Sequence, residues 1–270
     1  MFLRFLILGS LIGASSLSAK SWQGSAGASY SSDFTGASPL ASFYLGFSQP
    51  LNKTVTLGMN QGVNKKFYIY PDEDEFSLSD TSLYVSNSLG EWLMLSHSLS
   101  FSFSLPVSKY SRENEKYTNL KLGWAGAHKV LGDKLGLSYG ISGTAYLSKY
   151  QSSVSNDGLG GTPLPLYSLG ISHGGSYGII DKLSASYSLS LNRIWYYELD
   201  PEAGQDPVVV SDITDEVYSV SMQLSYAIEH GLTLSLGTSK GNLITQVGTL
   251  DLAFFDEDLS QYYISLGYLF

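Results

Sequence analysis

Hydrophobic and polar residues alternate one by one along several stretches of this chain. Between residues 98 and 104 every second residue is serine, and the residues between and after them are Leu99, Phe101, Phe103 and Leu105. The same period of two returns in 183–191, 218–228 and 232–237. Successive side chains of a β-strand point to opposite sides of the sheet, whereas a helix would spread the serines over all of its faces. The pattern therefore predicts strands with one apolar and one polar face.

The connections between these strands are alternately short and long. Short ones are predicted near 50–53, 89–92, 130–134, 180–182 and 230–231, and long polar ones near 32–38, 64–76, 108–116, 151–163, 196–214 and 240–258. Together they join about twelve strands, with ten or fourteen as alternatives because boundaries are the least reliable part of such a reading. Both ends of the sheet then lie on the side of the short turns.

Composition narrows the class of fold. Only 14% of the residues are charged and 13% are aromatic, whereas about a quarter of an average soluble domain is charged. Beyond the N-terminal segment no stretch approaches the ~20 apolar residues that a membrane helix needs. Low charge without long apolar runs is expected when one strand face contacts lipid and the other contacts water.

The N-terminus is predicted to be a cleaved secretory signal peptide, residues 1–19. Arg4 precedes an apolar stretch, Phe5 to Ile12, and small residues follow at 14–19. Residues 20–270 then form a single domain. The chain has no cysteine, so it enters an oxidising compartment without relying on disulfides.

Aromatic residues near the predicted strand ends suit the girdles at the two membrane interfaces, where a ring with a polar edge sits at headgroup level. These are Trp22, Trp92, Trp124, Trp195, Tyr196 and Tyr197.

The C-terminal stretch, Tyr262 to Phe270, places apolar side chains at alternate positions and ends on phenylalanine. It resembles the final strand by which bacterial outer-membrane β-barrels are recognised by their assembly machinery, with Tyr268 and Phe270 as the signal. The resemblance is to the porin-like class and to no specific family. It implies an all-β, transmembrane, up-and-down antiparallel barrel in the outer membrane of a Gram-negative-type bacterium. Short periplasmic turns, long extracellular loops and contact with outer-membrane lipid and lipopolysaccharide are expected.

If the apolar face contacts lipid, the opposite face lines the lumen. Small neutral polar side chains predominate there, with Lys121 as the charged member. The predicted lumen-lining residues are Ser42, Tyr44, Ser82, Tyr84, Ser102, Lys121, Ser142, Tyr146, Ser186, Ser221, Gln223, Ser235 and Tyr263. Such short side chains either leave a water-filled channel open or allow the barrel to flatten or a loop to fold inward as a plug. Tyr44, Tyr84 and Tyr146 either fill the lumen or offer rings on which a neutral solute stacks.

Acidic residues gather in the long loops and are predicted to form an acidic mouth. They are Asp72, Glu73, Asp74, Glu75, Glu198, Asp200, Glu202, Asp256, Glu257 and Asp258. Such a mouth would concentrate cations. We therefore expect a channel that passes small hydrophilic solutes by passive diffusion, with a mild preference for cations. The alternative is a structural or surface-interaction barrel whose acidic loops bind ions or lipopolysaccharide.

Other chemistries find little support. The net charge of −9 argues against nucleic-acid binding. No phosphate loop, zinc spacing or dinucleotide fingerprint occurs, so we expect no cofactor and no metal site.

The four histidines bear on an enzyme, the least favoured function. His97, His128, His173 and His230 fall toward the short turns and share the parity of the apolar face. Outer-membrane phospholipases carry a Ser–His pair toward the extracellular leaflet, and omptin-type proteases need a histidine at the extracellular rim. Neither arrangement is indicated, so no catalytic residue is predicted. A bulge at the glycine pair 174–175 would reverse the direction of His173.

Overall fold

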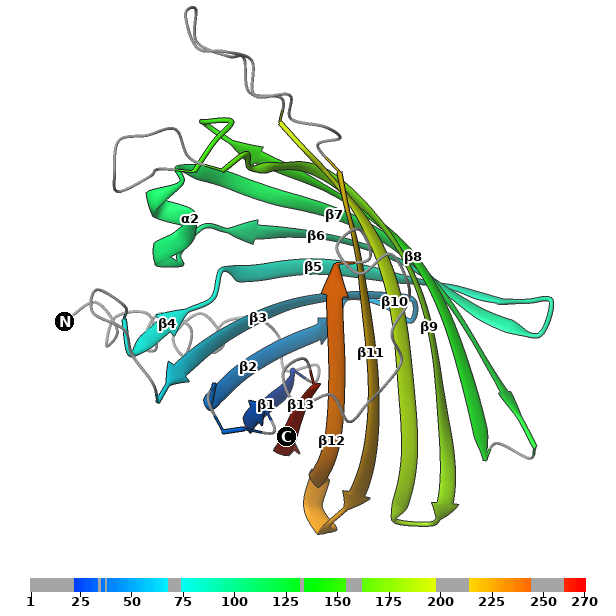
Figure 1. Ribbon diagram of the computed structural model, residues 1–270. Coiled ribbons are helices and arrows are strands. Elements are labelled where there is room, and N and C mark those ends of the chain that lie inside the picture. Colours follow the sequence, from blue (N-terminus) through cyan, green and yellow to red (C-terminus); the bar gives the residue numbers. More distant parts are fainter. Residues whose placement is uncertain are drawn as a thin grey trace, which may run out of the picture.

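The computed structural model describes residues 22–33, 35–36, 38–67, 74–131, 134–153, 162–197, 214–243 and 260–270. Nearly all of them lie in antiparallel strands (Figure 1). The strands are β1 (Gln23–Asp33), β2 (Leu40–Pro50), β3 (Val55–Lys66), β4 (Phe76–Leu78), β5 (Thr81–Trp92), β6 (Leu95–Leu105), β7 (Lys116–Val130), β8 (Leu135–Ser148), β9 (Pro165–Ile180), β10 (Leu183–Tyr196), β11 (Thr214–Ala227), β12 (Leu232–Leu243) and β13 (Ser260–Leu269). Helix α2 (Lys109–Glu113) lies between β6 and β7, and a 3₁₀ turn, η1 (Glu229–Gly231), lies between β11 and β12.

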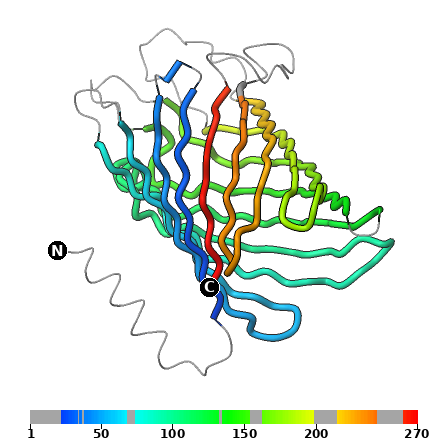
Figure 2. Tube along the Cα trace, turned by 90° about the horizontal axis from the view of Figure 1, so that it is seen from below, coloured from blue at the N-terminus to red at the C-terminus, as the bar shows by residue number. Residues whose placement is uncertain are grey.

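The strands form a closed ring. Apart from β4 and β5, each pairs with its neighbour in sequence, and β1 pairs with β13, with Ser25 opposite Leu269 and Asp33 opposite Gln261. Figure 2 shows these first and last strands side by side. Strands β4 and β5 pair with successive parts of β3 and so occupy one position in the wall. The predicted up-and-down barrel of about twelve strands is confirmed.

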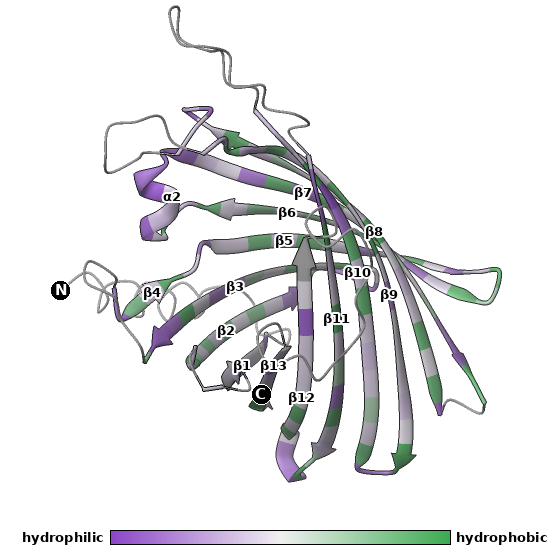
Figure 3. Cartoon of the chain, in the orientation of Figure 1, coloured by the Kyte–Doolittle hydropathy of each residue, from purple (hydrophilic) through white to green (hydrophobic). Residues whose placement is uncertain are grey.

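The alternation of the sequence becomes an inside and an outside of this ring. Ile141 lies opposite Ile171, which lies opposite Leu191, so apolar residues form continuous rows around the wall. Hydropathy alternates along the strands in Figure 3. Ile141 is 50% exposed and Ile171 is 52% exposed, and among the described residues the buried hydrophobic side chains are Leu164, Tyr218 and Val220. An apolar surface of this extent is stable only when covered, here by lipid.

A cavity of about 370 Å³ shows which face is concave. It is lined by Tyr44 of β2 and Gln223 of β11, together with Ser235 and Ser265 from the strands between. Side chains from β2 and β11, which are four strands apart, converge on this cavity, as expected on the inner side of a curved sheet. The serine-bearing face therefore lines the lumen.

The turn between β5 and β6 differs from its predicted place. Strand β5 continues to Trp92, and the turn residues are Leu93 and Met94, with φ of 51° and 62°. Two positive φ values match the twist of a hairpin, but they are usually supplied by Asn or Gly. Within the predicted turn at 89–92, the pairing of β5 with β6 instead has a bulge between Ser88 and Gly90, and Gly90 has a φ of 87°.

Helices contribute little to this structure. Among the described residues, no helix is long and apolar enough to cross a membrane.

Tyrosine and glycine are paired across neighbouring strands on the lumen side. The pairs in register are Tyr44 with Gly27, Tyr84 with Gly58, and Tyr263 with Gly237. In each pair the tyrosine ring occupies the space that a Cβ on the glycine would take. The rings therefore lie flat against the wall. Tyr44 and Tyr84 cover the wall rather than project into the lumen. Their role, as lumen filling or as rings on which a solute stacks, stays a prediction.

The seam between the chain ends is closed by the last residue. Phe270 and Gly24 exchange two backbone hydrogen bonds of 2.9 and 2.7 Å. The Phe270 ring lies over Gly24 and stacks on Tyr268 with 5.6 Å between the ring centroids. The role of these two aromatic residues as an assembly signal stays a prediction.

Replacing Gly58 by alanine tests the tyrosine–glycine pairing. The new methyl group overlaps the Tyr84 ring, so the ring has to leave the wall, and we expect the free energy of unfolding to fall by about 1 kcal/mol. Urea unfolding of the refolded protein measures this. Gly143→Ala is the control, since a Cβ there meets only the Ser168 carbonyl oxygen, at 3.9 Å. Equal stability of the two variants would show that the pairing contributes nothing.

Candidate functional site: the lumen and its mouth

The predicted lumen-lining residues all share one face of the wall. In the register, Lys121 lies opposite Ser102, which lies opposite Tyr84, and Ser142 lies opposite Gly123. The same side holds the others: Ser42, Tyr44, Ser82, Tyr146, Ser186, Ser221, Gln223, Ser235 and Tyr263. Lys121 is exposed on this face, in the middle of β7.

Two further charged residues face the lumen near the short turns. Glu91 lies opposite Ser96, and Lys129 lies opposite Gly136. Both line a cavity of about 930 Å³ whose other walls include Ser138 and Ser188. Glu91 was not predicted to face the lumen because residues 89–92 were assigned to a turn. Lys129 lies an even number of residues from Lys121 along β7, and this spacing could have identified Lys129 as a lumen residue.

Part of the lumen lining is tied together by hydrogen bonds. The Tyr263 hydroxyl donates to Gln223 Oε1 at 2.9 Å, and Gln223 Nε2 donates to the Ser225 hydroxyl at 2.6 Å. The Ser225 and Ser235 hydroxyls are 3.0 Å apart. These groups satisfy one another and hold the side chains near the wall, so the Gln223 amide is oriented before any solute arrives.

At the long-loop end, helix α2 is anchored to the residue before β5. The Asp80 carboxylate accepts hydrogen bonds from the Ser108 backbone N–H at 2.9 Å and from the Ser111 hydroxyl at 2.5 Å. Ser108 caps the helix by accepting from the Ser111 N–H, and Ser111 is 1% exposed. Burial alone would raise the pKa of Asp80, but the bonds from Ser111 and Ser108 and the nearby Lys116 charge outweigh it and lower the pKa.

Beneath this helix lies a cavity of about 550 Å³. Tyr110 of α2 lines it together with Tyr146 of β8, and with Tyr196 of β10 and Asp215 of β11. The Tyr196 hydroxyl donates to the Asp215 carboxylate at 2.8 Å. Tyr196 therefore faces the lumen, and its predicted place in an interfacial girdle is wrong. Its neighbour Trp195 does stay on the outer face, stacked on Tyr167 with 4.8 Å between centroids.

The described part of the predicted acidic mouth is ion-paired. Asp74 lies 2.8 Å from Lys109 Nζ, and Glu75 lies 3.0 Å from Lys65 Nζ. The remaining members lie outside the described residues: Asp72, Glu73, Glu198, Asp200, Glu202, Asp256, Glu257 and Asp258.

The histidines of the strands point outward with the apolar face. His97 lies opposite Gly126, His128 opposite Leu137, and His173 opposite Leu189. The pairing of β9 with β10 keeps its register through residues 174–175. Its register shift lies nearer the turn, between residues 183 and 184 of β10. The direction of His173 is therefore the one its parity predicts.

Their polar contacts are with backbone and tyrosine. His97 Nε2 lies 3.0 Å from the Trp92 carbonyl oxygen. His173 Nδ1 lies 3.1 Å from the Ser138 carbonyl oxygen and its Nε2 lies 2.7 Å from the Tyr187 hydroxyl. Within the described part of the chain, no three His, Asp or Glu side chains are grouped as metal ligands.

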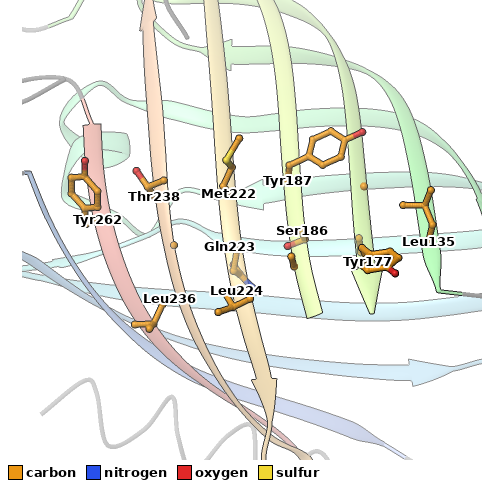
Figure 4. A pocket seen from close by; sticks show the side chains of 14 residues that line it. Leu135, Tyr177, Ser186, Tyr187, Met222, Gln223, Leu224, Leu236, Thr238 and Tyr262 are labelled. Atoms are coloured by element: carbon orange, nitrogen blue, oxygen red, sulfur yellow. The ribbon is translucent and has the colours of Figure 1, made fainter. Parts of the chain in front are cut away.

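An apolar depression of about 640 Å³ lies on the outer face of β8–β13 (Figure 4). Tyr187, Met222, Thr238 and Tyr262 form one cross-strand row along it. Gly175 and Ala185, which have no side chain or a small one, also line the depression. Since the row belongs to the lipid-facing side, the depression suits acyl chains and is separate from the lumen.

No family model and no curated protein matches this chain. Solved structures do match it. The outer membrane channel from Pseudomonas putida F1 is 12% identical, with a TM-score of 0.61 over 92% of this chain and 95% of that one. The NanC porin is 10% identical, with a TM-score of 0.54 over 91% of this chain and 98% of its own. The chain has the fold of an outer-membrane β-barrel. At such identities the likeness shows the fold alone.

The predicted localisation in the outer membrane agrees with this outer-membrane β-barrel fold. LpxR from Salmonella typhimurium also matches. It is 12% identical, with a TM-score of 0.44 over 91% of this chain and 100% of that one. A score this low carries no argument about function. The expectation that the barrel is not an enzyme stays a prediction.

The Asp80 anchor predicts that α2 loosens in acid. Because the pKa of Asp80 in the fold is below its ordinary 3.8, the carboxylate stabilises the helix above pH 3.8, and this stabilisation is lost as pH falls through the folded pKa. A nitroxide label attached to Glu113→Cys reports the mobility of α2, since the chain has no other cysteine. Electron paramagnetic resonance should show slow motion of the label at pH 7 and fast motion in acid.

Acid also acts on groups other than Asp80, so Asp80→Asn at pH 7 isolates the anchor. This variant should show the fast label at every pH, whereas Asp181→Asn, in the β9–β10 turn, should resemble the parent. A slow label in Asp80→Asn would refute the anchoring role.

Proposed function

We propose that this barrel is an outer-membrane channel that passes small hydrophilic solutes by passive diffusion. The observation that carries the proposal is the lumen face, which is continuous around the ring and in which serine, glycine and other small polar residues predominate. Its tyrosines at 44, 84 and 263 lie over glycines. Short side chains and flattened rings leave space for water along a twelve-stranded wall.

The cavities on the described lumen face support the same reading. They occur at both ends of the wall, with volumes of about 930 Å³ near the short turns and about 550 Å³ beneath α2. Hydroxyl groups of serine, threonine and tyrosine line them beside Glu91, Lys129 and Asp215. These hydroxyls offer a neutral solute hydrogen bonds that replace those of water. The likeness to an outer membrane channel and to a porin is in keeping with this role.

The charge of the pathway modifies the expected cation preference. Asp74 and Glu75 are neutralised by Lys109 and Lys65. Lys121 stands exposed in the lumen wall, and Thr144 and Ser102 lie opposite it. A lysine in a narrow aqueous path raises the local concentration of anions. We therefore propose that any cation preference is weak.

Planar-bilayer recording of the refolded chain tests the channel. We expect steps of steady current at neutral pH without added ligand, because the wall itself forms a permanent aqueous path. Insertions that stay electrically silent would contradict the proposal and favour the structural or surface-interaction barrel.

Reversing the charge at residue 121 tests the role of the lumen wall. In a KCl gradient, Lys121→Glu should shift the reversal potential toward that of K⁺, and the shift should shrink at high salt because screening weakens the field. Lys53→Glu, in the β2–β3 turn, changes the net charge equally outside the wall and should leave the reversal potential nearly unaltered. Equal shifts in both variants would remove Lys121 from the pathway.

A further inference from the structure

The cavity beneath α2 carries an inference that deepens the proposed function. Three tyrosine rings from separate elements surround it: Tyr110 from the helix, Tyr146 from β8 and Tyr196 from β10. Thr162 and Pro163 of the β8–β9 connection and Thr214, the first residue of β11, also line it. Cavities of this size, with aromatic walls and a few placed polar groups, are typical of small-ligand sites.

The position of the cavity is fixed by its surroundings. Leu164, between the two prolines at 163 and 165, is 1% exposed. Its N–H donates to the Gln151 carbonyl oxygen at 2.8 Å, and its carbonyl oxygen accepts from the Tyr197 N–H at 3.0 Å. On the opposite side, Asp80 holds α2 through Ser108 and Ser111. The elements that carry the three tyrosine rings are thus held in place before any ligand binds, which reduces the conformational entropy lost on binding.

The polar groups of the cavity suit hydroxyl groups. Asp215 accepts one hydrogen bond from Tyr196 and retains further acceptor positions on its carboxylate. The Tyr146 hydroxyl lies 3.3 Å from the Ser168 hydroxyl. A ligand with several hydroxyls and an apolar C–H face can donate to such oxygens while its C–H face packs against a ring.

Charged groups of both signs lie near the cavity. Lys116 Nζ lies 4.2 Å from the centroid of the Tyr110 ring, so one cation already occupies this ring and repels a second. Asp215 disfavours an anion on the other side. A ligand that is itself uncharged is not repelled by either group.

We propose that this cavity binds a neutral saccharide at the extracellular mouth, so that the channel passes sugars that it first captures there. The transport of the sugar rests on the proposed channel function, whereas its binding to the cavity does not. Capture near the entrance raises the local solute concentration and remains compatible with release, provided that binding is weak.

Calorimetric titration of the refolded full chain tests binding. Maltotriose and cellobiose are the probes, in an amine-oxide detergent because sugar-based detergents would compete. We expect one of them to bind with a Kd on the order of 1 mM, about tenfold weaker in Tyr110→Ala since the ring contact is lost. Tyr110 is 56% exposed and Tyr117 is 63% exposed, so Tyr117→Ala is a matched control and should bind as the parent does.

Three results would overturn the saccharide site: no heat with either sugar, equal affinity in Tyr110→Ala, or binding of choline in place of the sugars, which would make it a cation site. Bilayer recording of the unaltered chain distinguishes failure of the saccharide site from failure of the channel. Currents without sugar binding would contradict the saccharide site and support the channel. Sugar binding without currents would support the site and contradict the channel.

Discussion

Backbone pairing in hydrocarbon is the constraint on which the rest of this structure depends. A peptide group in the membrane interior has no water to bond, so a sheet that crosses it must have no open edge. The pairing of β1 with β13 meets this demand, and the two bonds between Gly24 and Phe270 extend it to the end of the chain. Once the ring is closed, each strand has one face toward lipid and one toward the lumen, and the alternation of the sequence follows.

The lumen face has to satisfy a second demand, because a wall of small residues alone would pack poorly. The tyrosine–glycine pairs provide contact area along the wall without filling the space inside it. Tyr84 covers Gly58, and Tyr263 covers Gly237 and also bonds Gln223. The same residue type behaves differently at the mouth, where Tyr110 and Tyr196 stand around a cavity. The same residue type thus covers the wall in one place and lines a cavity in another.

The sequence predicted the architecture well because the strand period is local. Leu99, Phe101 and Phe103 reveal their common face without knowledge of any partner strand. The parity of Lys121 and of the histidines at 97, 128 and 173 followed in the same way. Predictions were wrong where a local irregularity intervened: the Gly90 bulge resembled a turn, and Leu93 and Met94 formed one without the usual residues.

The mouth could not be predicted because it depends on contacts between distant segments. Asp80 lies 28 residues from Ser108, and nothing in the sequence near either residue marks their hydrogen bond. Helix α2 is five residues long, too short for a periodic pattern. Tyr196 stood next to Trp195 and was grouped with it, although neighbouring residues of a strand face opposite sides.

The orientation of the two faces is the central claim, and the cysteine-free chain allows a direct measurement of it. Single cysteines are placed in turn at residues 98 to 103 of β6, and the refolded protein in liposomes is exposed to a water-soluble thiol reagent. The account predicts that cysteines at 98, 100 and 102 react through the aqueous lumen, whereas those at 99, 101 and 103 are shielded by lipid. Uniform labelling, or labelling of the odd positions alone, would contradict it.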